Sequence, residues 1–247
     1  MPAVKSSVAV AFLSVVLGAF GLLSAAWVFV SLSRTAYLTA IVALGGAVFS
    51  FGMIAMLLTV ASRRVVPRAE WHQGGVTFRP DRRVDTLLVV SSLAGFFAMA
   101  LYAIFAPLGM LDIRAPRGNS QYIVIACAAG ALVGVFAIRH MLVQRGSSLL
   151  RMTVAGLETG NTMTTVRRSW DEVADIADRP ANGRHGTGAA YIVTADGRVR
   201  AHPTDWYTPG GQALRELMRF YWRHPERRSE LADGTALKRL QGDPPDR

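Results

Sequence analysis

Four long runs of apolar residues fill the first 143 positions of the chain, and a mostly polar segment follows them. The runs cover residues 8–32, 36–60, 86–111 and 122–138, and none of them contains Asp, Glu, Lys, Arg or His. A helix needs about 20 apolar residues to cross a bilayer, where it satisfies its backbone hydrogen bonds internally. The pattern therefore predicts a bundle of four membrane-spanning helices, the fourth of which continues to residue 142.

The polar links between these helices indicate how the chain crosses the membrane. Residues 33–35 and 112–121 form short links, whereas the link over residues 61–85 is longer and contains six arginines. Links that are rich in Lys and Arg stay on the cytoplasmic side of a membrane. We therefore expect a multi-pass protein of the inner (plasma) membrane, with the basic link and both termini in the cytoplasm.

The distribution of charge favours a membrane surface over nucleic acid. The formal net charge is +10, from 27 basic and 17 acidic residues. Residues 1–143 contain 11 basic and 4 acidic residues, which gives +7 and leaves +3 for residues 144–247. Because most of the excess lies beside the predicted helices, we expect anionic phospholipids among the partners and no nucleic acid.

Residues 147–231 change to short alternating segments, which predict a small cytosolic β-rich domain of the α+β class. Strands are expected over residues 149–154, 162–168, 173–177, 189–194 and 198–202. Asp196-Gly197 lies between the last two strands and is a strong signal for a hairpin turn. Residues 232–247 are expected to be a flexible tail.

An amphipathic helix is expected to follow the strands, over residues 212–223. Leu214, Leu217 and Tyr221 recur there at the spacing of one helix face. Earlier in the chain, residues 74–79 have the pattern of a turn and a short strand that Pro80 ends. This segment either adds a strand to the sheet of the β-rich domain or forms a solvated basic loop.

Four segments of the β-rich domain resemble bacterial PH-like domains attached to small actinobacterial membrane proteins. They are residues 150–157, 168–176, 194–199 and 223–231. In that pattern a tryptophan opens the turn before the third strand, and Trp170 matches it. The resemblance implies a barrel of strands closed by a helix. The architecture as a whole also resembles small accessory proteins that stabilise lipid-import assemblies of the Mce type.

Small residues repeat at helical spacing along the predicted membrane helices. Such residues let two helix backbones approach closely in lipid. The candidate packing positions are Ser14 and Gly18 on the first helix, Gly46 and Ser50 on the second, and Ala126, Gly130 and Gly134 on the fourth. They are expected either to pack the four helices together or to dock another membrane protein.

Several arginines are candidates for contact with anionic lipid head groups: Arg63, Arg64, Arg151, Arg167 and Arg168. The other interpretation is a basic margin that only fixes topology. Arg198 and Arg200 are two residues apart, so they share one face of their strand, which we expect to be exposed.

The sequence shows no motif for catalysis, a cofactor or a metal. The five histidines have no metal-ligand spacing, and no phosphate-binding glycine loop or nucleophile elbow is present. Asp171, Glu172, Asp175 and Asp178 form an acidic cluster that is expected to line a turn and a strand edge. We therefore expect a non-enzymatic accessory or scaffold protein that binds partner membrane proteins, with a lipid transporter as the candidate partner. The alternative function is a module that binds or senses anionic lipid.

Overall fold

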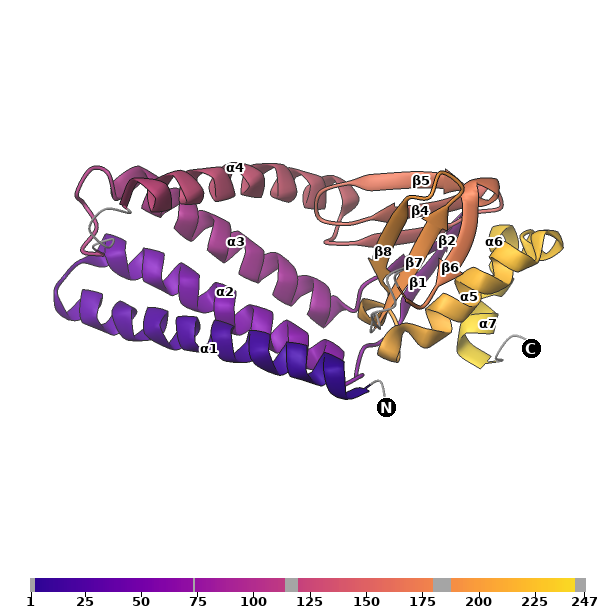
Figure 1. The fold of residues 1–247 in the computed structure, drawn as a ribbon, viewed down its shortest axis with the longest axis horizontal. Coiled ribbons are helices and arrows are strands. Elements are labelled where there is room, and N and C mark those ends of the chain that lie inside the picture. Colours follow the sequence, from indigo (N-terminus) through magenta and orange to yellow (C-terminus); the bar gives the residue numbers. More distant parts are fainter. Residues whose placement is uncertain (1–2, 73, 114–119, 180–187, 243–247) are drawn as a thin grey trace. The chain divides into compact units, whose positions relative to one another are not determined.

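The structure is a computed structural model that describes residues 3–72, 74–113, 120–179 and 188–242 (Figure 1). It divides into two compact units. One contains Val8–Leu57 and Thr86–Val143 and is helical; the other contains Met1–Ser7, Leu58–Asp85 and Gln144–Arg247 and is rich in strands.

The four long apolar helices that the sequence predicts are present. They are α1 (Ala3–Ser33), α2 (Tyr37–Ala61), α3 (Arg82–Phe105) and α4 (Ser120–Gln144) (Figure 1). Each of them is long and apolar enough to cross a membrane. Their long uncharged stretches and large exposed apolar side chains, such as Phe12, Phe29 and Leu142, are typical of helices that face lipid.

Helix α3 differs from its expected bounds at both ends. It begins at Arg82, because Asp81 acts as its N-cap and accepts a hydrogen bond from the Arg83 N–H at 2.6 Å. It ends at Phe105, six residues before the predicted end. Pro107 follows closely and disfavours a helical residue before it. Gly109, at φ +68°, then turns the chain away from the helix axis.

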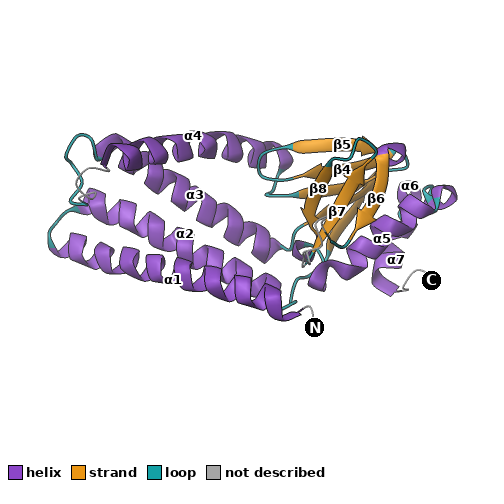
Figure 2. Cartoon of the chain, viewed as in Figure 1, coloured by secondary structure: helices purple, strands orange, loops and turns teal. Residues whose placement is uncertain are grey.

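The second unit contains two antiparallel sheets (Figure 2). The first has the order β1-β2-β3-β4-β5, with bounds Arg68–His72, Gly75–Arg79, Leu149–Met152, Gly156–Gly160 and Thr165–Ser169. The second has the order β6-β7-β8, with bounds Val173–Ala177, Ala189–Thr194 and Val199–Pro203. The hairpin predicted at Asp196-Gly197 joins β7 and β8, and Gly197 adopts the left-handed φ of +76° that the turn requires.

The link between α2 and α3 contributes two strands to the first sheet. Strands β1 and β2 pair with each other, and β2 then pairs with β3, which lies beyond α4 in the chain. Phe78 lies opposite Leu150 in this pairing, and both are almost fully buried. Of the two interpretations of residues 74–79, the structure therefore supports the strand over the solvated loop.

Strand β4 was not expected from the sequence. Ala155-Gly156 reads as the end of a strand, but in the structure Gly156 is where the next strand begins. A Cβ atom at Gly156 would lie 2.0 Å from the carbonyl oxygen of Arg168 on β5. Glycine inside a sheet can mark a close approach of another backbone as well as the end of a strand. Gly156 does the former, since it lets β4 and β5 come close together.

One hydrophobic core joins both sheets to helix α5 (Gln212–Arg223), whose bounds match the prediction. Leu214, Leu217 and Tyr221 of α5 are buried in it, as the helical spacing indicated. Trp170 lies in the same core and donates a hydrogen bond from its ring N–H to the Thr153 carbonyl at 2.9 Å. Arg228 lies over the Trp170 ring, 5.1 Å from its centre.

The segment predicted to be a flexible tail is partly helical. After α6 (Glu230–Asp233), helix α7 extends over Thr235–Gly242. Ala236 of α7 is fully buried in the core, and the ring N–H of Trp71 donates to the Ala232 carbonyl at 2.9 Å. The polar composition of this segment hid these contacts, because they involve a few small residues and one distant aromatic side chain.

The pairing of β2 with β3 can be tested by truncating its central side chain. Phe78→Ala should lower the free energy of unfolding by about 3–5 kcal/mol, since it removes a buried aromatic ring and leaves a cavity. Glu70→Ala, at an exposed position of β1, is the control and should change stability by less than about 0.5 kcal/mol. Chemical denaturation of the full chain measures both. Equal stability of the two variants would mean that this segment is a solvated loop.

Candidate functional site

The helical unit contains a large apolar cavity between its helices. Its volume is about 690 Å³, and residues from all four helices line it. Apolar side chains dominate the lining, among them Phe49, Phe96 and Met99, with Ser24 and Tyr102 among the few that carry polar groups. The volume falls within the range of about 300–1,000 Å³ that is typical of small-molecule sites.

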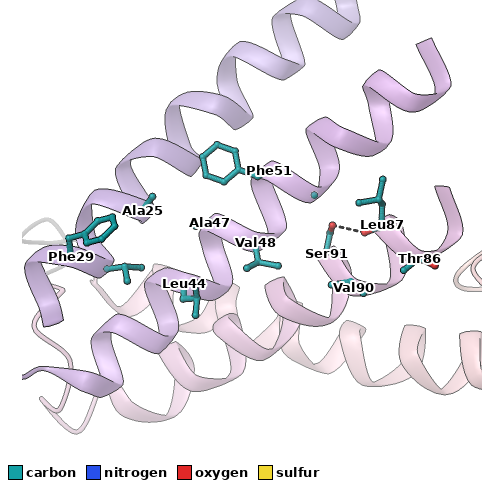
Figure 3. A pocket seen from close by; sticks show the side chains of 12 residues that line it. Ala25, Phe29, Leu44, Ala47, Val48, Phe51, Thr86, Leu87, Val90 and Ser91 are labelled. Carbon is teal, nitrogen blue, oxygen red and sulfur yellow. Dashed lines mark hydrogen bonds between the residues drawn. The ribbon is translucent and has the colours of Figure 1, made fainter. Parts of the chain in front are cut away.

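A second cavity of about 600 Å³ lies between α1, α2 and α3 (Figure 3). Ala25 and Phe29 of α1, Val48 of α2 and Val90 of α3 are among its lining residues. Thr86 and Ser91 supply hydroxyl groups to the lining, and the Ser91 hydroxyl donates to the Leu87 carbonyl of its own helix at 2.5 Å (Figure 3). The lining therefore offers an apolar surface and almost no polar group for a ligand.

Both cavities are open to the outside of the helices, so each is a cleft that its surroundings can fill. Water covers an apolar lining unfavourably, because each molecule needs two to four polar partners. The lining therefore favours an apolar molecule over water.

Most of the predicted small-residue positions lie against neighbouring helices of the same bundle. A Cβ atom at Gly134 would lie 2.4 Å from the Phe96 ring, and one at Gly130 would lie 2.7 Å from the Met99 sulfur. The corresponding atom at Gly46 would be 3.1 Å from the Ser24 hydroxyl.

The other candidate packing positions are more varied. A Cβ atom at Gly18 would be 3.9 Å from Ile54, and Ser50 is fully buried beside Gly21. Ser14 is half-buried, whereas Ala126 is exposed and so is not part of a packed glycine face. Close approach within the bundle thus accounts for most of the pattern.

The tightest of these contacts predicts a difference between two equivalent substitutions on α4. Gly134→Ala should destabilise the protein by about 1–3 kcal/mol, because the new methyl group overlaps the Phe96 ring and forces a backbone shift. Gly130→Ala should cost less, since it meets the flexible end of Met99. Thermal unfolding of the two variants in the same detergent tests this order, and a reversed order would contradict the α3–α4 packing.

The candidate lipid-contact arginines do not form one surface. Arg63 and Arg64 are exposed just after α2. Arg151 on β3 and Arg167 on β5 both lie opposite Glu158 of β4, and Arg167 pairs with its carboxylate at 3.2 Å. Arg168 points to the other face of β5, because successive strand residues alternate.

Arg168 instead lines a groove between the two sheets. The groove has a volume of about 230 Å³, and Arg198 of the β7–β8 turn and Arg200 of β8 also line it. The sequence predicted that Arg200 would be on an exposed face, but it is half-buried at this groove. Strand alternation predicted on which side of its strand Arg200 lies. It could not show that this side faces the first sheet and not the solvent.

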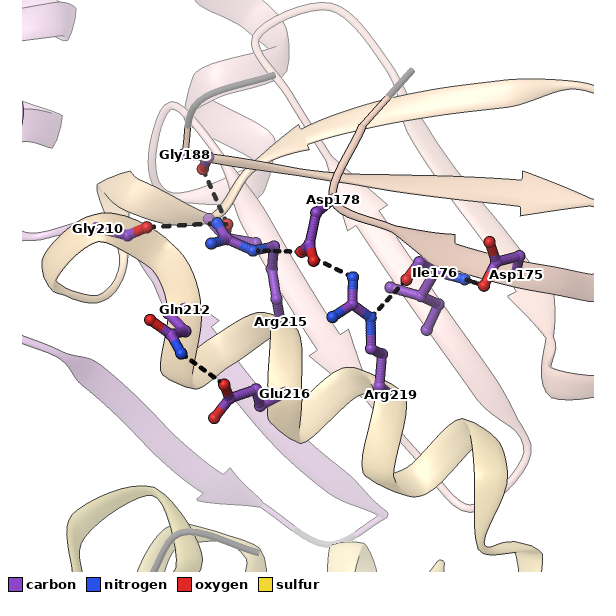
Figure 4. Close-up of polar contacts among 10 residues, drawn as sticks. Asp175, Ile176, Asp178, Gly188, Gly210, Gln212, Arg215, Glu216 and Arg219 are labelled. Carbon is purple, nitrogen blue, oxygen red and sulfur yellow. Dashed lines mark hydrogen bonds and ion pairs between the residues drawn. The ribbon is translucent and has the colours of Figure 1, made fainter. Parts of the chain in front are cut away.

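The acidic cluster is largely structural. Asp178 accepts ion pairs from Arg215 at 3.0 Å and from Arg219 at 2.7 Å, which connect the end of β6 to α5 (Figure 4). Asp175 accepts from the Ile176 N–H. No group of three or more His, Cys, Asp and Glu side chains in the described ranges gathers closely enough to hold a metal ion.

Two titratable groups of the β-rich unit are shielded from water: His202 is buried, and Asp205, three residues later, is half-buried. Burial lowers the pKa of His202 to about 3, with a further contribution from the charge of Arg200. Burial raises the pKa of Asp205 to about 7, although backbone N–H groups and Arg215 oppose this shift. The His202 ring is therefore neutral at pH 7, and the Asp205 carboxyl is close to half-protonated.

These shifts act on stability in opposite directions. Between pH 3.8 and about 7 the folded chain holds a proton on Asp205 that the unfolded chain has lost, so stability falls as pH rises. Between about pH 3 and 6.5 the unfolded chain holds the extra proton on His202, so stability rises with pH. Only the Asp205 effect remains above pH 6.5.

Removing the Asp205 charge should therefore stabilise the protein most at high pH. Asp205→Asn should gain roughly 2–4 kcal/mol relative to the wild-type chain at pH 8, from about three pKa units at 1.36 kcal/mol each, and much less at pH 4. Unfolding midpoints across this pH range measure the difference. Asp171→Asn, at an exposed carboxylate, is the control. A pH-independent gain would show that Asp205 does not titrate in this window.

Searches of protein-family models, curated proteins and solved structures found no match to this chain.

Proposed function

We propose that this chain is a non-enzymatic, multi-pass membrane protein that holds an acyl chain of a bilayer lipid between its four helices. The observation that carries this proposal is the apolar cavity of about 690 Å³ lined by all four helices. The cavity is open to the outside of the helices, and its apolar lining disfavours water. In a bilayer, lipid acyl chains are the apolar molecules that are available.

The polar groups near the cavity fit a lipid molecule. Ile113 lines the cavity, and the residue before it, Asp112, forms an ion pair with Arg34 at 3.1 Å. The Asp112 N–H is held by the Thr39 hydroxyl at 3.0 Å. A charged pair therefore lies beside the apolar cavity. A phospholipid has the same arrangement, with a charged head group next to its apolar acyl chains. Several arginines lie before α3 and after α2, and they support placing both termini in the cytoplasm.

The proposal is tested by filling the cavity. Ala43 is buried and lines it, so Ala43→Phe should reduce the lipid that remains bound to the purified protein at least severalfold. Ala26→Phe is the matched control, because Ala26 is exposed on α1 and its ring would point away from the packed interior. Native mass spectrometry in mild detergent measures the bound lipid. Ser92→Leu is a second filling variant if Ala43→Phe does not fold.

Two results would overturn the lipid proposal. The first is wild-type protein that is purified without lipid, and the second is unchanged lipid in both filling variants. In either case the cavity would be closed by another molecule or by collapse of the helices.

An accessory role with a partner membrane protein is a second candidate function. The exposure of α1 favours this role. Only 6% of the apolar stretch of α1 is buried, compared with 28% for α2, so most of α1 is open to a partner. Since the glycines of α4 already face α3, a partner would dock on the outer face of α1 or on the β-rich unit. A protein subunit retained at fixed stoichiometry in the same mass spectra would support this function over the lipid proposal.

A further inference from the structure

We propose that the groove between the two sheets of the β-rich unit binds a phosphate monoester group. This inference concerns a different unit from the acyl-chain cavity and does not rest on it. The groove is bounded by the hairpin β4–β5 on one side and by β7–β8 on the other. Both β5 and β8 are edge strands of their sheets, so the groove lies where neither sheet continues.

The strand register gives the groove an apolar floor and a cationic rim. Arg168 lies opposite Leu157, and Arg200 lies opposite Ile192, so each arginine shares a sheet face with a buried apolar residue. Such inward faces of edge strands normally carry apolar side chains. Two arginines at these positions are costly, since burial disfavours their charge.

Arg200 has no carboxylate partner within the described part of the chain. Its guanidinium donates only to neutral oxygen atoms: the Thr164 hydroxyl at 3.2 Å, the Thr164 carbonyl at 3.3 Å and the Thr159 carbonyl at 3.5 Å. Its pKa is lowered by burial and then by the nearby charge of Arg168. A neighbouring anion would relieve both effects.

The carboxylates near the groove compensate only part of its charge. Glu172 is 3.8 Å from Arg168 and more than half exposed, which makes a long and weak contact. Asp196 pairs with Arg198 at 3.2 Å. Three guanidinium groups against two carboxylates leave one positive charge, and Arg200 is the group without a pair.

A phosphate group suits this arrangement. It carries about −1.5 to −2 charges at pH 7 and offers three acceptor oxygens, and arginine binds it through parallel N–H donors. The groove volume of about 230 Å³ could hold several water molecules at about 30 Å³ each, or one such group with part of an apolar substituent. Val166 and Val199 would contact that substituent. The phosphate can come from a lipid head group or from a soluble ester.

The experiment uses the full chain in nanodiscs and separates these two sources. In the first arm, inorganic phosphate and glycerol 3-phosphate are titrated into phosphatidylcholine nanodiscs by calorimetry. In the second arm, phosphatidic acid is included in the nanodisc, and its ³¹P resonance is measured. Binding in the first arm indicates a soluble ester, and binding in the second arm alone indicates a lipid head group.

The arginine variants decide whether the groove is the site. Arg200→Gln and Arg168→Gln should each weaken binding at least tenfold, whereas Arg200→Lys should retain part of it. Arg167→Gln is the matched control, because Arg167 is next to Arg168 on β5 but faces Glu158. Thermal unfolding confirms that each variant is folded. If Arg200→Gln does not fold, Arg168→Gln alone tests whether the groove binds phosphate.

Two outcomes would overturn the proposal. One is the absence of phosphate binding in both arms. The other is binding that Arg167→Gln weakens as much as Arg200→Gln does. The arginines would then serve to keep the two edge strands from pairing with other chains, which is a known use of inward-facing charge.

Discussion

The pairing of β2 with β3 joins two stretches of chain that are separated by α3 and α4. Because paired strands lie about 4.8 Å apart, this one contact brings the start of α3 and the end of α4 into the β-rich unit. Arg79 at the end of β2 donates to the Gln144 and Arg145 carbonyls, both at 3.0 Å, and so satisfies the C-terminus of α4. Asp85 in the first turn of α3 accepts from the Ser147 N–H at 2.7 Å. Without this strand pair, none of these end contacts could form.

Periodicity in the sequence predicted those elements whose partners are local or whose surroundings are uniform. The four apolar helices, the Asp196-Gly197 hairpin and α5 all fall in this group, since each carries its own signal. Residues 75–79 were ambiguous, because a five-residue strand is stabilised by a partner about 70 positions away. Pattern alone cannot distinguish such a strand from a loop. Helix α7 was missed for a related reason, because Ala236 packs in a core built from distant elements. Strand β4 was missed although its partners are its neighbours in the sequence, because Gly156 resembles the end of a strand.

The candidate sites depend on tertiary contacts even more strongly. Helical spacing showed that Gly130 and Gly134 share a face, but only the structure shows that α3 covers it. The same side chains serve two purposes. Phe96 and Met99 of α3 lie against the glycines of α4 and also line the large cavity.

Desolvation explains why the two proposed sites belong to different units. A guanidinium in the helical unit would be costly without a partner, and the four apolar runs contain no ionisable acid or base other than Tyr and Cys. The ion pair Arg34–Asp112 of that unit lies in the links at the helix ends. An apolar ligand therefore suits the helical unit. An anion needs a partly solvated site, such as the groove between the two sheets of the β-rich unit. There Arg200 can keep its charge through carbonyl and hydroxyl contacts until a ligand replaces them.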